Sequence, residues 1–288
     1  MICVMAATGE VGKATVEHLL RLGVHPSRIV AAGRAPSKME YLSRAGISVR
    51  AADYADGRGM AGAFRGVETL VLIPTKTPAA PRCVEHANAL AAARSAGVKR
   101  IVFLSVQAAT STSQFNVAPF LLFAESATRQ SGMRWTFARM SLYTDPIAEW
   151  APELARMGRL PYPVTQARVA YVTRADVSRS LAAVALRDDL DSRIVEFTGP
   201  VALSMPELAV AVSKATGTKI SFATISSDEY RELCRKDKLP EEMIDILVTM
   251  HKAAEAQEFS HVSGDILALT GIAPESVANA LARILPAP

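Results

Sequence analysis

The sequence predicts an α/β fold, in which a doubly wound parallel sheet is followed by a smaller, mostly helical C-terminal lobe. One observation above all predicts the parallel sheet. Short apolar runs typical of buried strands alternate with segments of helical period up to about residue 200. Such regular alternation is typical of parallel strands joined by right-handed helical crossovers. We expect the strands at residues 2–5, 28–33, 47–51, 69–73, 100–105, 134–138 and 195–199.

Composition limits the kinds of protein that the chain can be. It has 288 residues, of which 50% are hydrophobic and 21% charged, so it can bury a large core. The net charge of +4 is spread thinly, which gives no indication of nucleic acid or an anionic membrane as a partner. The cysteines and histidines have no metal-ligand or disulfide spacing, and the longest apolar run, residues 117–124, is too short for a membrane span. We expect a soluble cytoplasmic protein without a metal site.

The first strand leads into a glycine turn that opens a helix at residues 10–20. A helix that starts directly after a parallel strand directs unpaired N–H groups and its positive dipole end at the turn, which suits a pyrophosphate. Gly9 would let the backbone approach the phosphates, and Gly12 would let the helix pack on the strand. An ordinary turn with incidental glycines is the alternative. The candidate cofactor-binding residues here are Ala6, Thr8, Gly9, Glu10, Val11 and Gly12.

Ala6 stands where the dinucleotide-binding fingerprint has its first glycine. A Cβ atom at this position has two explanations. Either the turn is shifted, which weakens pyrophosphate binding, or the residue is tolerated because its φ stays negative. We expect the shifted turn and the weaker binding.

The second strand is followed by Arg34 and, one helical turn later, by Lys38, without a carboxylate nearby. Dinucleotide folds bind the adenosine ribose about 20 residues past the glycine turn, where an acidic residue accepts from a 2′-hydroxyl and an arginine accommodates a 2′-phosphate. Gly33 leaves room for that phosphate. The sequence therefore predicts that NADP(H) is preferred over NAD(H). A solvated basic helix start is the alternative, although a helix N-terminus disfavours cations.

Other strand ends supply further candidates, because ligands of such sheets bind outside the carboxyl ends of the strands. Asp53 and Tyr54 end the third strand, where a side chain can cover an adenine; capping of the next turn is an equal alternative for Asp53. The other candidates at strand ends are Ile73, Pro74, Ser105, Arg139, Met140, Ser141, Leu142 and Tyr143.

Helices are expected between the strands and throughout the last part of the chain. They are expected at residues 80–96, 117–130 and 146–160, the last closed by Pro161-Tyr162-Pro163. Capping boxes begin at Thr173, Ser204 and Ser226. A short strand is expected at 219–224, and Leu239-Pro240 precedes a long helix that two short helices follow. We predict a cofactor-binding domain at 1–200 and a substrate lobe at 201–288, to which residues 145–165 contribute.

Together these motifs resemble the NmrA-like branch of the atypical short-chain dehydrogenases. The residues that carry the resemblance are Ala7-Thr8-Gly9-x-x-Gly12, Arg34 with Pro36 and Lys38, Ala52-Asp53-Tyr54, Ala96-Gly97-Val98-Lys99, Tyr143-Thr144-Asp145, Thr173-Arg174-Ala175-Asp176 and Leu239-Pro240. The resemblance implies a Rossmann-like domain that binds NADP(H) and a lobe that bounds a hydrophobic substrate pocket. It also implies cofactor contacts at residues 8–11, at Arg34, at Pro74, Thr75 and Lys76, and from Arg139 to Thr144.

The chain also departs from this family. Relatives carry a histidine or lysine near the position of Leu121, and no tyrosine here has a lysine four residues later. Glu125 alone on its helix is expected to be solvated or ion-paired. Without a positioned proton-transfer pair, alcohol dehydrogenation and sugar epimerisation are disfavoured. Quinone or dye reduction remains compatible, since the cofactor supplies the hydride.

Two functions follow as expectations, and no catalytic residue is identified for either. The first is an NADPH-dependent reductase of quinone-like or other flat aromatic acceptors, with Phe120, Leu121, Met140 and Tyr143 as substrate residues. The second is a non-catalytic NADP(H)-sensing regulator that binds a partner protein. The sequence leaves the acceptor and the oligomeric state open, a homodimer included.

Overall fold

The computed structural model describes residues 1–75 and 77–285 and divides the chain into two compact units. The first consists of Met1–Val106, Pro119–Arg139 and Val177–Val195, and the second of Gln107–Ala118, Met140–Asp176 and the chain from Glu196 onward. The sequence-based boundary at residue 200 stays a prediction, because this division rests on packing within the chain and not on independent folding.

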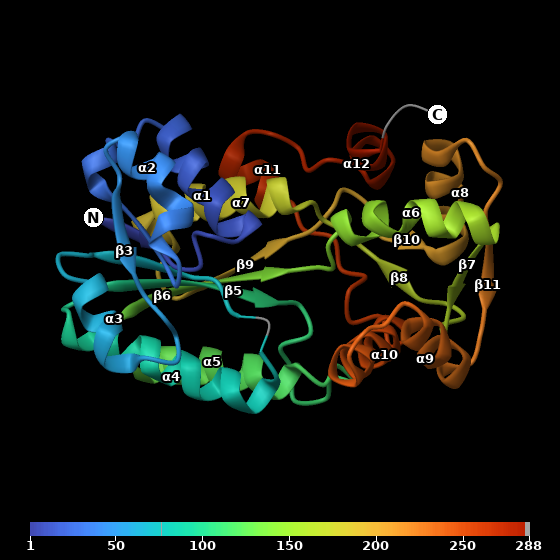
Figure 1. Cartoon of the computed structure of the whole chain (residues 1–288), viewed down its shortest axis with the longest axis horizontal. Helices are drawn as coiled ribbons and strands as arrows, with labels where there is room; N and C mark the ends of the chain where they lie inside the picture. Colours follow the sequence, from blue (N-terminus) through green and yellow to red (C-terminus); the bar gives the residue numbers. More distant parts are fainter. Residues whose placement is uncertain (76, 286–288) are drawn as a thin grey trace. The chain divides into compact units, whose positions relative to one another are not determined.

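A seven-stranded sheet forms the centre of the first unit (Figure 1). Its strands are β1 (Ile2–Val4), β2 (Ile29–Gly33), β3 (Ser48–Ala51), β4 (Thr69–Leu72), β5 (Arg100–Val106), β6 (Arg134–Met140) and β9 (Arg193–Phe197). They are arranged in the order β3-β2-β1-β4-β5-β6-β9, and β1 pairs in parallel with both β2 and β4. The winding therefore reverses at the β1–β4 neighbours. The predicted doubly wound, Rossmann-like sheet is confirmed.

The central strands β1, β2 and β4 form because their residues suit burial on both faces. All five residues of β2 and all four of β4 are buried. Parallel strands covered by helices on both sides have such continuous apolar sequences. Met5 N–H donates to the Val71 carbonyl and Ala7 N–H to the Ala32 carbonyl, each at 3.0 Å. The end of β1 is thus held between its two neighbours.

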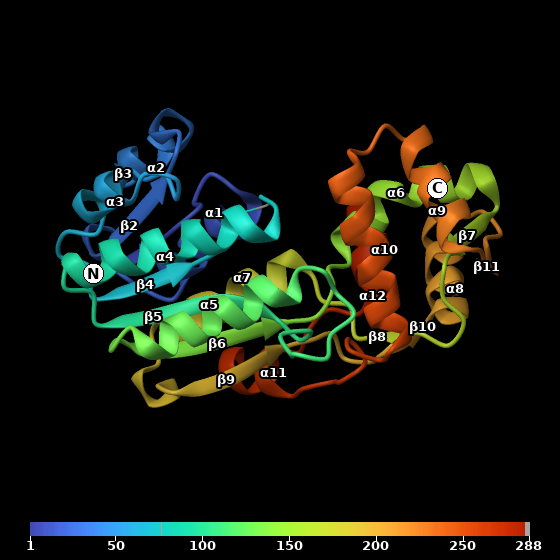
Figure 2. The ribbon, with the colours of Figure 1, turned by 90° about the horizontal axis from the view of Figure 1, so that it is seen from below.

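Helices cover both faces of this sheet. They are α1 (Glu10–Arg21), α2 (Glu40–Arg44), α3 (Gly57–Ala63), α4 (Ala79–Ser95), α5 (Ala118–Gln130) and α7 (Arg174–Ala185), with short 3₁₀ turns at Pro26–Arg28, Pro36–Met39 and Asp188–Leu190. Figure 1 shows α1 and α7 on one face and α3, α4 and α5 on the other. The Ser178 hydroxyl on α7 donates to the Val11 carbonyl on α1 at 3.2 Å. In Figure 2, α4 and α5 lie side by side across the strands.

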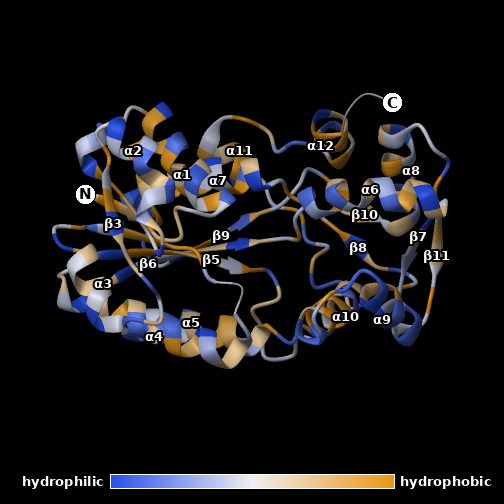
Figure 3. Ribbon diagram, viewed as in Figure 1, coloured by the Kyte–Doolittle hydropathy of each residue, from blue (hydrophilic) through white to orange (hydrophobic). Residues whose placement is uncertain are grey.

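The second unit is mostly helical. Its elements are α6 (Asp145–Met157), β7 (Arg159–Tyr162), β8 (Arg168–Val169), β10 (Leu203–Ser204), α8 (Met205–Thr216), β11 (Ser221–Thr224), α9 (Ser227–Lys236), α10 (Glu241–Glu255), α11 (Asp265–Thr270) and α12 (Val277–Ile284). β7 pairs with β11 in parallel, and β8 pairs with β10 antiparallel. Figure 3 shows α9 as mostly hydrophilic, whereas α10 carries both hydrophobic and hydrophilic residues. No helix of the described residues is both long and apolar enough to span a bilayer.

The helix expected at residues 146–160 is shorter than predicted. α6 ends at Met157, where Gly158 adopts a left-handed conformation with φ of 64°, a common way to end a helix. Residues Arg159–Tyr162 then form β7. The expected helix starts are borne out by bonds to hydroxyl groups: Thr173, Ser204 and Ser226 each accept from the backbone N–H three residues later.

Candidate functional site

The glycine turn brings α1 very close to the end of β1. A Cβ atom on Gly12 would lie 2.4 Å from the carbonyl oxygen of Ala6, so only glycine fits at this position. Gly9 is the N-cap of α1 and offers no side-chain cap to the first turn. Backbone N–H groups at an uncapped helix start need acceptors, and an anionic ligand can supply them. The arrangement fits the pyrophosphate-binding role predicted for this turn.

Ala6 adopts a left-handed backbone conformation with φ of 54°. The explanation that its φ stays negative is therefore wrong. A left-handed L-residue costs about 1–2 kcal/mol, because its Cβ crowds the following carbonyl. Since Gly12 still packs against the Ala6 carbonyl, the turn keeps the close contact that the fingerprint requires. Neighbouring contacts impose on an alanine the conformation that a glycine would adopt freely.

Arg34 and Lys38 follow the end of β2, and both are exposed. Within residues 1–75 and 77–285, neither side chain has an ion pair or hydrogen bond. A Cβ on Gly33 would lie 3.4 Å from the Thr8 methyl group, so the end of β2 is adjacent to the glycine turn. The positive charges of Arg34 and Lys38 beside this turn suit binding of the 2′-phosphate of NADP(H).

Asp53 and Tyr54, expected near the adenine, both make contacts within the first unit. The Asp53 carboxylate accepts from the Ala55 N–H at 3.0 Å, as the turn-capping alternative predicts. Tyr54 is buried, and its hydroxyl donates to the Ile73 carbonyl at 2.8 Å. Burial raises the pKa of Tyr54, so its hydroxyl is a hydrogen-bond donor and not an acid near neutral pH. Tyr54 thus fixes the backbone just after β4.

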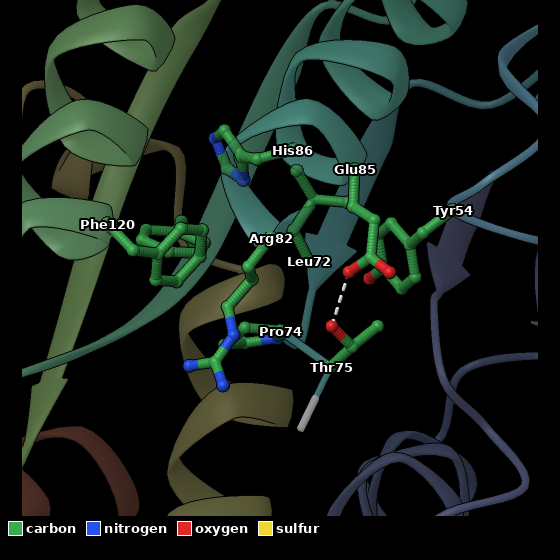
Figure 4. A pocket seen from close by; sticks show the side chains of 9 residues that line it. Tyr54, Leu72, Pro74, Thr75, Arg82, Glu85, His86 and Phe120 are labelled. Carbon is green, nitrogen blue, oxygen red and sulfur yellow. Dashed lines mark hydrogen bonds between the residues drawn. The ribbon is translucent and has the colours of Figure 1, made fainter. Parts of the chain in front are cut away.

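The loop after β4 borders a small cavity of about 10 Å³, enough for about one water molecule. Its lining residues are Tyr54, Leu72, Pro74, Thr75, Arg82, Glu85, His86, Phe103 and Phe120. Figure 4 shows Thr75 facing the Glu85 carboxylate, with Phe120 on the opposite side from Tyr54. Arg82, Glu85 and His86 come from α4 and were not singled out from the sequence. The predicted residue Lys76 lies outside the described residues.

Ser105 and Arg139 are brought together by a residue between them, Glu125 on α5. Glu125 is almost fully buried, and the Ser105 hydroxyl donates to its Oε1 at 2.8 Å. Arg139 binds the carboxylate as a fork, from Nε to Oε1 at 2.9 Å and from Nη2 to Oε2 at 2.7 Å. Arg129 adds a third charged contact at 3.2 Å. Glu125 is therefore ion-paired, one of the two expected states, and ties α5 to β5 and β6.

The two expected substrate residues of α5 are both buried. Phe120 and Leu121 are each 1% exposed. The Phe120 ring packs edge-on against Phe103 and lies under the Arg82 guanidinium, whose carbon is 5.1 Å from the ring centroid. A cation over an aromatic face is favourable when both are shielded from water. Phe120 thus joins α5 to the cavity beside the β4 loop.

Residues 140–144 begin with the last residue of β6 and belong to the second unit. The Met140 carbonyl accepts from Gln107 N–H, and Ser141 N–H donates to the Phe197 carbonyl, both at 2.9 Å. Leu142 and Thr144 pair through their backbones with Val172, at 2.9 and 3.0 Å. The Tyr143 ring lies under the Arg174 guanidinium, whose carbon is 5.5 Å from its centroid. The buried Thr144 hydroxyl has no hydrogen-bond partner within the described ranges.

Comparison with known proteins identifies the family. The model of the NmrA-like family matches residues 1–272. The chain belongs to the NmrA-like family. It is 30% identical to quinone oxidoreductase 2 of Escherichia coli (strain K12) over 86% of this chain and 85% of that one. The structure of that NADPH-dependent enzyme complexed with NADPH has a TM-score of 0.93 and 28% identity, with 99% of each chain covered.

Two further members of this set of relatives are reductases. Triphenylmethane reductase of Citrobacter sp., solved in complex with NADP(H), has a TM-score of 0.92 and 27% identity over 99% of this chain and 100% of that one. The NAD(P)H azoreductase of Xenophilus azovorans is 25% identical over 94% of this chain and 93% of that one. The resemblance that the motifs indicated is thus confirmed by the match of the NmrA-like family to residues 1–272.

Proposed function

We propose that this protein uses NADPH to reduce a quinone-like or other flat aromatic acceptor. It is an NAD(P)H-dependent oxidoreductase, and NADP(H) is its cofactor. The observation that carries the proposal is the likeness, over nearly the whole chain, to reductases whose names specify a quinone, an azo compound and a triphenylmethane dye. These acceptors share an extended conjugated π-system.

The chain provides the groups that NADPH needs at the adenosine and pyrophosphate end. Gly12 permits the close approach of α1, and the uncapped first turn offers N–H donors to the pyrophosphate. Arg34 and Lys38 are free to bind the 2′-phosphate as charge-assisted donors. NADPH, when bound, supplies the hydride.

A protein that reduces a quinone-like acceptor mainly has to place two flat partners in contact and exclude competing water. None of the six tyrosines has a lysine four residues later, so the usual proton-transfer pair is missing. Solvent supplies the proton that completes reduction of the acceptor. The assignment of Phe120, Leu121, Met140 and Tyr143 as substrate residues remains a prediction. The three cysteines are unpaired, which suits a reducing compartment such as the cytosol.

The deciding experiment follows NADPH absorbance with a panel of uncharged quinones and triphenylmethane dyes, beside a titration of NADPH binding without acceptor. We expect saturable turnover with at least one large uncharged acceptor, and slower turnover with NADH. Tight binding of NADPH without turnover across the panel would contradict the proposal and favour the NADP(H)-sensing regulator. Absence of NADPH binding would contradict both.

A further inference from the structure

Three polar side chains on one face of α4 contact the segments after β3 and β4. They are Arg82, Glu85 and Asn88, spaced three residues apart, so they lie along one side of the helix. The Asn88 amide donates to the Tyr54 carbonyl at 3.1 Å. The Arg82 guanidinium donates from Nε to the Thr77 carbonyl at 2.8 Å. Together with the bond from Tyr54 to Ile73, these contacts hold the carbonyl groups of Ile73 and Thr77.

Glu85 is the centre of this arrangement. Its Oε2 accepts from the Thr77 hydroxyl at 2.8 Å and also from the Thr75 hydroxyl. The two hydroxyl oxygens lie 2.6 Å from each other. A carboxylate only accepts hydrogen bonds when it is ionised, so it can serve both donors at once. Glu85 on α4 therefore holds the side chains of Thr75 and Thr77.

This loop starts at the place where a cofactor is expected. β4 is the neighbour of β1, and the Met5 N–H bond to Val71 lies at the ends of the two strands. The winding reverses between these strands, and open α/β sheets bind their ligands at such a switch point. The residues after β4 therefore begin beside the glycine turn on α1.

We propose that Glu85 is a positioning residue that holds Thr75 and Thr77, which follow β4, in the arrangement needed for productive binding of the nicotinamide cofactor. The inference rests on the proposed function, because it assigns a role in the same NADPH site. Glu85 acts through the hydroxyls of Thr75 and Thr77 and is not itself a catalytic residue. Small errors in such positioning are costly, because a displacement of about 1 Å can lower a rate about a hundredfold.

The test compares Glu85→Ala and Glu85→Gln with wild type in two assays. The first is hydrogen–deuterium exchange of the peptide covering residues 73–78 in the cofactor-free protein. The second measures kcat at saturating NADPH and the Kd for NADPH. Glu68→Gln is the matched control, because Glu68 is exposed and pairs with the N-terminal amine at the opposite, amino end of β4.

We expect Glu85→Ala to speed exchange of the loop about tenfold, the effect of losing one or two hydrogen bonds of ordinary strength. We expect kcat to fall about tenfold or more, with a smaller rise in Kd, and Glu85→Gln to lie between wild type and Glu85→Ala. Thr75→Val and Thr77→Val should each reproduce part of the loss. In a Glu85→Ala background they should add little further loss, since they remove the same contacts. Glu68→Gln should match wild type.

Two results would overturn the inference while leaving the proposed function intact. One is Glu85→Ala with wild-type exchange and wild-type kinetics. The other is faster loop exchange without any change in kcat or Kd, which would make the contact purely structural. If Glu85→Ala does not fold, the two threonine variants decide by the same criteria. A wild-type protein without NADPH binding or turnover would instead overturn the proposed function, and this inference with it.

Discussion

The carbonyl oxygen of Ala6 occupies the space that a Cβ atom on Gly12 would need, since the two would lie 2.4 Å apart. Ala6 lies in the turn after β1 and Gly12 in the first turn of α1, so a Cβ atom on Gly12 would fit only if the helix moved away from the turn. The helix can therefore start this close to β1 only because Gly12 has no Cβ atom.

Gly12→Ala should therefore damage both the fold and the cofactor site. We expect the free energy of unfolding to fall by about 1–3 kcal/mol, the usual cost of overpacking. The Kd for NADPH should rise about tenfold as α1 moves from the turn. Urea unfolding and NADPH titration measure the two effects. Gly62→Ala is the control: no atom lies within 4 Å of its Cβ position, so it should leave the Kd unchanged and, inside α3, raise the free energy of unfolding by up to about 1 kcal/mol. A Gly12→Ala protein of wild-type stability would contradict the structure of the turn.

Ala6→Gly should stabilise the protein. It relieves the left-handed alanine, worth about 1–2 kcal/mol, at an entropic cost of about 0.4–1 kcal/mol in the unfolded chain. We expect a net gain of about 0.5–1 kcal/mol in urea unfolding and little change in the Kd for NADPH. Ala91→Gly, an exposed position inside α4, should show the opposite sign, a loss of about 1 kcal/mol. A loss with Ala6→Gly would be inconsistent with its φ of 54°.

Arg34→Ala should reduce the discrimination between the two nicotinamide cofactors. A charge-assisted hydrogen bond to the 2′-phosphate is worth about 1.5–3 kcal/mol. The Kd for NADPH should therefore rise by about 10- to 100-fold, while the Kd for NADH stays almost constant. Fluorescence titration of both cofactors checks this. Arg28→Ala, an exposed arginine at the amino end of β2, should change neither value. Equal affinities of the wild-type protein for NADPH and NADH would refute the assignment.

Glu125→Gln should affect stability more than rate. The buried carboxylate holds Arg139, Arg129 and Ser105, so its neutralisation leaves charges without their counterion and should cost about 3 kcal/mol of unfolding free energy. We expect kcat to change only a few-fold. A loss of about a hundredfold, the lower end for a general acid, would identify Glu125 as the proton donor instead. Glu153→Gln, which breaks an exposed pair with Arg156, should leave stability and rate close to wild type.

His251 should make the protein less stable in mild acid. Its ring packs against Tyr162 and Tyr230, with centroids 4.5 and 4.9 Å away, and burial lowers the pKa of His251 from 6.5 to about 3. The unfolded chain therefore binds a proton below pH 6.5 that the folded chain does not. Consequently the free energy of unfolding decreases as the pH is lowered, by about 2–3 kcal/mol from pH 6.5 to pH 4.5.

His251→Phe should remove about half of the combined slope of the two buried histidines, in urea unfolding measured across the same pH range. His86, whose pKa burial lowers to about 4, should maintain a residual slope. The exposed His25→Phe change should leave the slope at its wild-type value. An identical pH dependence of stability in His251→Phe and wild type would show that His251 is protonated in the folded protein as readily as in the unfolded chain.

The sequence was informative where local rules decide the structure. Buried parallel strands such as Thr69–Leu72 are apolar throughout, and hydroxyl caps such as Ser204 identify helix starts. It was less informative where contacts are distant. β7 contains Pro161, which argues against a strand, and it forms because Ser221–Thr224 pairs with it from far along the chain. Likewise, nothing local predicts the left-handed Ala6.

The same holds in the candidate site. The glycine turn and Arg34 are adjacent in a known motif, so their roles can be predicted from spacing. Ser105, Glu125 and Arg139 come from three elements, and only the fold brings them together. The α4 face could have been found, because Arg82, Glu85 and Asn88 recur at helical spacing opposite a threonine-containing loop. Their partners could not, since a helix position does not specify which loop it contacts.

The two compact units share the chain unevenly. The chain passes between them at residues 106–107, 118–119, 139–140, 176–177 and 195–196. A ribosome therefore delivers every segment of the first unit before residue 196, whereas the second unit lacks α8 to α12 until the end of synthesis. During translation, residues 107–118 and 140–176 are made before their packing partners in the second unit, which come from the chain after residue 195. A chain truncated near residue 200 would keep residues 107–118 and 140–176 without the rest of the second unit. The second unit therefore cannot be removed by truncating the chain at one position.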